Sequence, residues 1–150
     1  MDAETLFTVC NVGVLPFWAL LALAPGWLWT RRLVHAMWIP LALAATYGIA
    51  FLMGPGLPEE AGFGSLPAVM AFFSVPEAAL AGWIHYLVFD LFVGAWEVRD
   101  ARRRGLPHAA VIPCLILTLL LGPLGLAAYL LLRLALARTA SLVETPATAT

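Results

Sequence analysis

The chain has 150 residues, of which 63% are hydrophobic and 11% are charged, and its formal net charge is −1. Soluble domains typically carry about 25% charged residues, so this composition excludes an ordinary soluble protein and predicts an integral membrane protein of one domain. The small net charge also argues against nucleic acid as a partner, because a nucleic-acid-binding domain needs a broad basic surface.

Four segments of the chain are long and apolar enough to cross a membrane as helices, which takes about 20 mostly apolar residues. They are Leu6–Leu28, Leu33–Met53, Val75–Val98 and Ala109–Leu132. The sequence therefore predicts an all-α, polytopic membrane protein, namely a bundle of four transmembrane helices. We expect a single domain at residues 1–138 and a polar, disordered tail at 139–150.

The connection between the second and third segments, residues 54–74, is rich in Gly and Pro and then briefly apolar. It fits a re-entrant or interfacial stretch, or a lid. At its end, the sequence Ser-Val-Pro-Glu has the form of a capping box, with Ser74 as the N-cap and Glu77 as its partner. Pro76 is acceptable in a first helical turn, so we assign Glu77 a structural role.

The arginines are distributed unevenly among the connections. Arg31 and Arg32 join the first two segments, and residues 99–104 bring four more between the third and fourth. The connection 54–74 has none. The positive-inside rule then places both Arg-rich connections in the cytoplasm and both termini outside, as in a bacterial inner membrane. Arg133 and Arg138, after the fourth segment, oppose this arrangement.

Two short stretches share an Arg, a His, an Ala, an Ile and a Pro at a constant offset, in the ranges Arg31–Pro40 and Arg104–Pro113. Two tandem helical hairpins would produce this pattern, and so would coincidence. The cysteines, Cys10 and Cys114, lie in different segments, and the sequence has no Cys/His cluster of metal-binding spacing. We therefore expect free thiols, no metal site and no other cofactor.

Ionisable residues in the third segment are the main functional signal, because an ionisable side chain at membrane depth is costly and marks function by default. At about 100° per residue, one stripe of the helix contains Trp83, Tyr86, Asp90 and Glu97. His85 lies about 140° from Asp90 on the same helix. We take Asp90 and His85 as the catalytic candidates and expect Glu97 at the membrane interface. An interhelical hydrogen bond is an equally weighted alternative for His85.

Polar and aromatic residues elsewhere are candidates for lining the same pocket. The substrate-binding candidates are Trp83, Tyr86, Asn11, Tyr47, Thr118 and Pro123. Pro123 has no N–H for the carbonyl of Leu119, so the fourth helix should be kinked in the sequence Gly-Pro-Leu-Gly. A kink that faces the polar stripe would shape a pocket.

These residues also carry a resemblance. The stretches WIHYLVFDLF (83–92), RDARRRGLP (99–107) and PCLILTLLLGPLGLAAYLLLR (113–133) resemble the neoxanthin-synthase-like family, which in plants is the abscisic-acid-deficient-four family. The resembling positions are Trp83, His85, Asp90, Leu91, Phe92, Asp100, Pro113, Cys114, Gly122, Pro123 and Gly125. The resemblance implies a membrane isomerase that converts an epoxy-carotenoid to an allenic one.

That isomerisation needs an acid for the epoxide oxygen and a base for a vinylic proton, and it needs neither a redox cofactor nor a metal. Asp90 and His85 would divide the two roles. The implied partners are membrane lipid and a carotenoid or other isoprenoid ligand. A second class of function remains open: a non-catalytic membrane protein that binds pigment or lipid, forms a homo-oligomer, or packs as a small subunit of a larger membrane complex.

Overall fold

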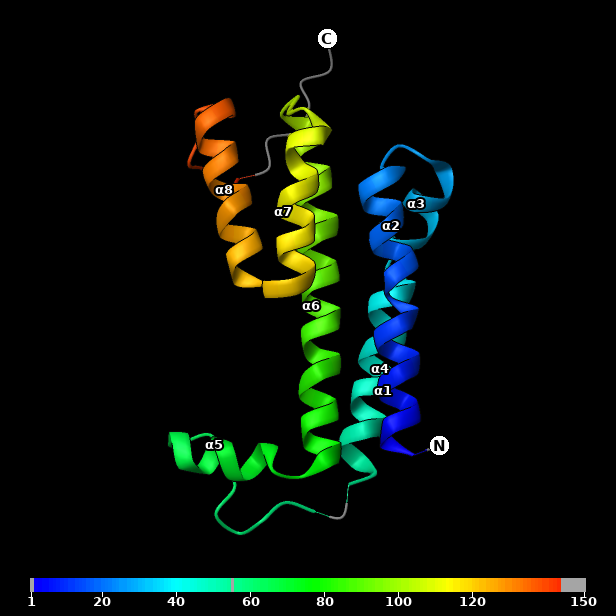
Figure 1. The fold of residues 1–150 in the computed structure, drawn as a ribbon, viewed down its shortest axis with the longest axis vertical. Helices are drawn as coiled ribbons and strands as arrows, with labels where there is room; N and C mark the ends of the chain where they lie inside the picture. The colour runs from blue at the N-terminus through cyan, green and yellow to red at the C-terminus, as the bar shows by residue number, and fades with distance from the viewer. Residues whose placement is uncertain (1, 55, 144–150) are drawn as a thin grey trace. The chain divides into compact units, whose positions relative to one another are not determined.

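The computed structural model describes residues 2–54 and 56–143, and these residues form eight α-helices and no strand (Figure 1). The prediction of an all-α protein is confirmed. The internal contacts group the chain into two compact units. Unit 1 comprises Met1–Pro16 and Ala36–Phe89, and unit 2 comprises Phe17–His35 and Asp90–Thr150. Helix α6, Pro76–Arg103, contributes residues to both units.

Unit 1 is built from α1 (Ala3–Gly13), α4 (Trp38–Leu52), α5 (Leu66–Phe73) and the first half of α6. Side-chain oxygens cap two of these helices. The Asp2 carboxylate accepts a hydrogen bond from the Thr5 amide at 2.7 Å, and the Ser65 hydroxyl oxygen accepts one from the Ala68 amide at 3.3 Å. Each cap satisfies one of the amides that have no partner inside the helix.

Helix α6 does not begin with the predicted capping box. The Ser74 hydroxyl instead donates to the Ala71 carbonyl at 2.7 Å, at the end of α5. Ser74 has helical backbone angles, φ −72° and ψ −18°, and therefore lacks the extended conformation that an N-cap needs. Pro76 is the first residue of α6, as expected, and Glu77 lies in its first turn, where the helix dipole favours a carboxylate.

Unit 2 contains most of α2 (Leu15–Leu23), α3 (Leu28–Leu33), the second half of α6, α7 (His108–Leu121) and α8 (Pro123–Ala137). Helices α1 and α2 follow one another with a break at Val14. Pro16 explains the break, because it has no N–H for the carbonyl of Val12. Both cysteines are buried free thiols, as predicted.

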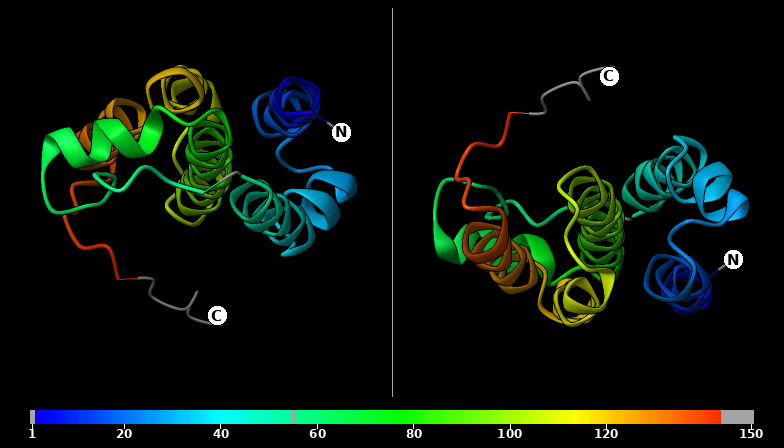
Figure 2. Two further views of the ribbon diagram at one scale, coloured as in Figure 1. Left: turned by 90° about the horizontal axis from the view of Figure 1, so that it is seen from below. Right: turned by 90° about the horizontal axis from the view of Figure 1, so that it is seen from above.

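The chain reverses at Gly122 instead of continuing through one long fourth helix (Figures 1 and 2). Gly122 has φ +46° and ψ −99°, a conformation that favours glycine, and Pro123 starts the next helix. Helices α7 and α8 pack against each other. A Cβ atom on Gly125 would overlap the backbone of Thr118, so the close approach needs glycine there. The predicted single helix Ala109–Leu132 is therefore wrong.

The reversal bears on how many helices can cross a membrane. Among the described residues, Ala3–Leu23 and Pro76–Arg103 are long and apolar enough to do so. Helices α4, α7 and α8 have 15, 14 and 15 residues, which is short of the roughly 20 residues that a crossing needs. The structure thus supports two of the four predicted crossings.

The structure also bears on the predicted internal repeat and on the predicted C-terminal tail. The predicted repeat is not in register with the helices, because α4 begins at Trp38, after His35, whereas α7 begins at His108 itself. The predicted polar tail follows α8 without helical structure over residues 139–143, and Arg133 donates a hydrogen bond to the carbonyl of Ser141 there. Residues 144–150 lie outside the described part of the chain.

All eight basic residues of the chain are arginines, and all eight belong to unit 2. The Arg102 guanidinium donates to the Pro25 carbonyl at 3.0 Å. Arg104 and Arg133 both pair with Asp100, at 3.0 and 3.3 Å. The expectation that the arginines after the fourth segment lie at the opposite end from residues 99–104 is therefore wrong, because α8 returns to that end after the reversal.

Candidate functional site

Unit 1 contains a cavity of about 280 Å³ that we call the aromatic cavity. Its lining includes Tyr47, Phe51, Phe63, Phe72, Phe73 and His85. The rings pack against one another: the centroids of Phe63 and Phe72 are 5.0 Å apart, and those of Phe51 and Phe72 are 6.1 Å apart. The cavity therefore offers apolar ring surfaces and one imidazole.

Neighbours on two helices hold His85 at this cavity. Its ring lies 4.5 Å from that of Phe89, one turn further along α6, and 6.3 Å from that of Tyr47 on α4. Residues four positions apart share a helix face, so Phe89 limits the positions of the imidazole. The structure thus brings together the predicted catalytic residue His85 and the predicted binding residue Tyr47.

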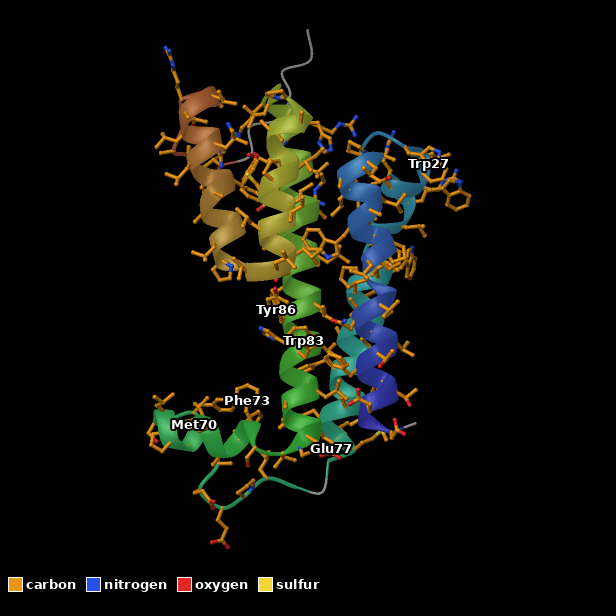
Figure 3. The ribbon with its side chains drawn as sticks, viewed as in Figure 1. Trp27, Met70, Phe73, Glu77, Trp83 and Tyr86 are labelled. Carbon is orange, nitrogen blue, oxygen red and sulfur yellow. The ribbon has the colours of Figure 1, made fainter. Side chains whose placement is uncertain are left out.

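The connection 54–74 forms part of the cavity wall through α5 and Phe63. Phe73 lies at the end of α5, beside α6 (Figure 3). A Cβ on Gly82 would lie 2.6 Å from the Phe73 ring, so glycine at this position of α6 makes room for that ring. These contacts make α5 and Phe63 part of the cavity wall; whether the connection is re-entrant, interfacial or a lid stays a prediction.

Three other predicted binding residues form a separate group in unit 1. The Trp83 indole N–H donates to the Asn11 side-chain oxygen at 3.1 Å, which ties α6 to α1. The Trp83 ring also packs against Phe7 at 5.7 Å and Tyr86 at 5.2 Å (Figure 3). None of these residues lines the aromatic cavity. Their contacts join helices, and a role for them in ligand binding stays a prediction.

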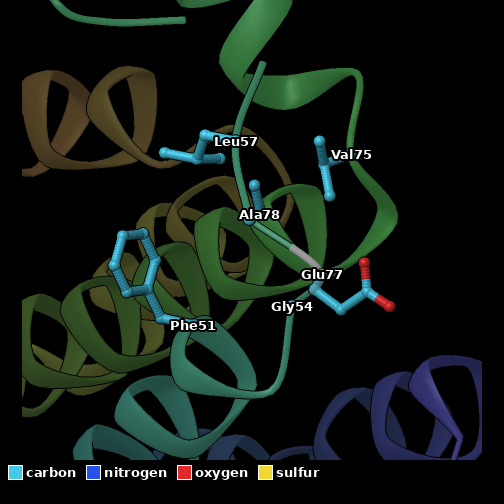
Figure 4. A pocket seen from close by; sticks show the side chains of 7 residues that line it. Phe51, Gly54, Leu57, Val75, Glu77 and Ala78 are labelled. Carbon is cyan, nitrogen blue, oxygen red and sulfur yellow. The ribbon is translucent and has the colours of Figure 1, made fainter. Parts of the chain in front are cut away.

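Glu77 does not act as the predicted capping-box partner, but a structural role in the first turn of α6 still accounts for it. It borders a small cavity of about 130 Å³ with Phe51, Gly54 and Leu57. Figure 4 shows its carboxylate pointing away from Phe51. Its place in the first turn of α6 accounts for a negative charge without any catalytic role.

Asp90 belongs to unit 2 and is half-buried on α6. Glu97 lies seven residues further on, about two turns along nearly the same face of the helix. His85 belongs to unit 1, so the predicted pair of Asp90 and His85 is divided between the units. Its joint action stays a prediction.

Glu97 is the carboxyl group whose environment was not foreseen. It is fully enclosed by protein, whereas an interfacial position was expected. The Thr118 hydroxyl donates to its Oε1 at 3.0 Å, and its Oε2 has no hydrogen-bond partner among residues 2–54 and 56–143. The reversal at Gly122 explains the burial, because it brings α7 and α8 together and Gly125 lets them approach closely at Thr118.

Asp100 anchors a second buried cluster in unit 2. Its carboxylate accepts a hydrogen bond from the Tyr129 hydroxyl at 2.7 Å and two from Arg104 at 3.0 Å. It also pairs with Arg133 at 3.3 Å. Asp100 and Arg133 are each 1% exposed. A carboxylate so fully engaged by cations and a hydroxyl joins α6 to α8 and has no free oxygen for catalysis.

Sequence reasoning missed Tyr129 and Arg133 because it continued α7 straight through Gly122. The signal was available in the spacing of α8, where the two residues lie four positions apart and therefore share a face.

The sequence matches a model of a known protein family over most of its length. A family model described as ABA DEFICIENT 4-like matches residues 5–129, a range that includes every predicted site residue. Neither the comparison with curated proteins nor the comparison with solved structures gives a significant match. Because the match extends over well more than half of the chain, the resemblance predicted from the sequence is confirmed, and the chain belongs to the ABA DEFICIENT 4-like (ABA4-like) family.

Proposed function

We propose that this protein is a membrane-embedded isomerase that acts on a carotenoid or other isoprenoid by acid–base chemistry. The observation that carries the proposal is the aromatic cavity with His85 in its wall. Family membership supports it, since the resemblance implies this type of reaction. The substrate, the catalytic roles and the membrane location are all parts of the proposal.

The membrane location is supported by the apolar side chains that the fold leaves uncovered. Leu23 and Leu52 are 82% and 83% exposed, and many other large apolar residues are exposed as well. In water, each Å² of such surface costs about 25 cal/mol, and a bilayer removes that cost. Together with the two long apolar stretches, this surface favours a position within lipid.

The aromatic cavity suits the end group of a long polyene. Ligand pockets commonly measure roughly 300–1,000 Å³, so a cavity of about 280 Å³ would hold one end of such a molecule and leave the rest in lipid. Aromatic walls provide apolar contact, and the His85 imidazole can accept a proton from a carbon beside the bound ring.

The proposed reaction adds one proton to the substrate and removes one, so it needs no other reactant. In the proposal, Asp90 gives a proton to the epoxide oxygen as a carbon–oxygen bond breaks. His85 takes a proton from a vinylic carbon, and the electron pair of that carbon–hydrogen bond forms the new double bond of the allene. One proton enters and one leaves, so the product is an isomer, and the two side chains must exchange protons with solvent before the next turnover.

The test is conversion of violaxanthin by membranes that contain the protein, with products separated and identified by chromatography and mass spectrometry. We expect an isomer of unchanged mass with an allenic absorption spectrum, and none from membranes without the protein. Violaxanthin that is bound by the purified protein and recovered unchanged would overturn the enzymatic proposal and favour pigment binding.

We also propose that the arginine-rich end of unit 2 faces the cytoplasm and that α7 and α8 enter the membrane from that side without crossing it. In cells that express a variant without Cys10 and Cys114, single cysteines at Gly105 and Ala140 should both be protected from an impermeant thiol reagent. A cysteine at Gly62 should react, because α6 crosses the membrane between Gly62 and Gly105. This orientation also requires the chain between Arg31 and Gly62, which contains α4, to return across the membrane. Protection at Gly105 together with reaction at Ala140 would mean that the chain crosses the membrane between them.

A further inference from the structure

Unit 2 has a hollow of about 510 Å³ at its arginine-rich end, which we call the basic hollow. It is lined by Arg31, His35, Arg99, Arg102 and Arg103. Four of these five side chains are guanidinium groups, and no carboxylate is among them. The proposed isomerase reaction uses none of them. We infer that the basic hollow is a binding site for a phosphate group.

His35 supplies the first independent observation. Its Nδ1 lies 3.2 Å from Nη1 of Arg99. A guanidinium only donates hydrogen bonds, so Nδ1 accepts, and the proton of the neutral imidazole is on Nε2. That Nε2 atom is buried and has no hydrogen-bond partner in the described part of the chain. A buried N–H donor without an acceptor is costly. Because His35 lines the hollow, a phosphate oxygen would satisfy this donor once the ring turns toward it.

The electrostatics of the hollow supply the second observation. Burial, together with the charges of Arg99, Arg102 and Arg31, lowers the pKa of His35 to about 4. His35 lies between α3 and α4, outside both candidate membrane spans. The low pKa indicates that the arginines around His35 disfavour one more positive charge, so an anion bound there would meet a positive field.

Asp100 does not neutralise this field. Asp100 is 3.5 Å from Arg103, but its oxygens are closer to Arg104, Arg133 and Tyr129. Arg102 uses one of its five N–H donors on the Pro25 carbonyl. Guanidinium groups recognise phosphate through paired hydrogen bonds, and the basic hollow presents several of them together.

Phosphate can come from a lipid headgroup or from a soluble compound. Trp27 (Figure 3) and Trp29, also in unit 2, are 52% and 48% exposed, and exposed tryptophan is typical of the membrane–water interface. This position favours an anionic phospholipid, whose headgroup would lie at the same depth. The experiments below distinguish a lipid headgroup from a soluble phosphate compound.

The test uses the full-length protein in neutral detergent, with native mass spectrometry to count bound lipid. We expect phosphatidylglycerol to be retained in preference to phosphatidylcholine. Arg31→Gln should weaken that retention about tenfold, the effect of losing one charge-assisted hydrogen bond. The matched control is Arg32→Gln, which removes the same charge from a side chain stacked over Trp29 at 5.8 Å and outside the hollow. It should change retention less than about twofold.

A second readout follows the imidazole directly. NMR titration of His35 should give a pKa that rises when phosphatidylglycerol is added, because the bound anion offsets the arginine charges. By linkage, binding should then strengthen as the pH falls from about 7 toward 5. A rise in the His35 pKa with inorganic phosphate but not with the lipid would assign the site to a soluble phosphate compound. Equal losses in Arg31→Gln and Arg32→Gln, or an unchanged His35 pKa with both probes, would overturn the inference.

Discussion

Asp90→Asn is expected to lower the rate of violaxanthin conversion by about 10²- to 10⁴-fold while the protein still folds. Asparagine keeps the size and hydrogen-bonding capacity of aspartate but cannot supply a proton, and general acid–base catalysis contributes rate factors of this size. His85→Gln should cause a loss in the same range if His85 is the base. The measurement is the initial rate in membranes at matched protein levels, with the thermal midpoint as a check on folding.

Glu77→Gln is the matched control for this experiment, because it neutralises another carboxylate of the same helix that does not line the aromatic cavity. Its rate should stay within about twofold of the unmodified protein. Glu97→Gln separates two interpretations of the acid. If Glu97→Gln abolishes conversion and Asp90→Asn does not, then the proton donor is the buried carboxyl beside Thr118 and the proposal for Asp90 is wrong. Full activity in both variants would contradict carboxyl catalysis on this helix.

Asp100→Asn is expected to destabilise the protein by about 3–5 kcal/mol, the usual effect of removing one partner from a buried ion pair. The change leaves Arg133, which is 1% exposed, without its counter-charge. It also weakens the contacts of Arg104 and Tyr129 with α6. The measurement is the unfolding free energy in detergent from denaturant titration, or the loss of folded protein in membranes if the variant does not survive purification.

Two further variants make the Asp100 result specific. Glu60→Gln removes an exposed carboxylate and should change the unfolding free energy by no more than about 0.5 kcal/mol. Arg133→Met added to Asp100→Asn should restore part of the lost stability, because it removes the orphaned charge. An Asp100→Asn variant as stable as Glu60→Gln would show that the cluster does not hold α8 to α6.

The sequence predicted the elements of this fold better than their connections. The apolar run after Pro76 predicted most of α6, and Tyr47 was predicted to line the same pocket as His85. The reversal at Gly122 did not follow, because an unbroken apolar run with one proline is equally compatible with a kinked helix. The positive φ of Gly122 and the close approach of Gly125 to Thr118 distinguish a reversal from a kinked helix. Both are seen only in the folded structure.

Glu97 and Arg133 were both misplaced because of that one connection. Glu97 was expected at the interface because nothing in α6 shows that α7 and α8 pack on each other at Thr118. Arg133 was expected far from residues 99–104 for the same reason. By contrast, the Ser74 error was local: the side chain type was right for a cap, but the backbone of α5 extends to it and uses its hydroxyl first.

The reversal at Gly122 also bears on how the chain enters a membrane. Carrying one arginine into the hydrocarbon core costs about 2.5–3.5 kcal/mol on insertion scales, and a straight fourth helix would require Arg133 and Arg138 to traverse the bilayer. With α8 folded back, neither arginine has to be translocated. In the proposed orientation, the C-terminal hairpin can enter the cytoplasmic leaflet after α6 is in place, so its insertion does not oppose the charge asymmetry that orients the rest of the protein.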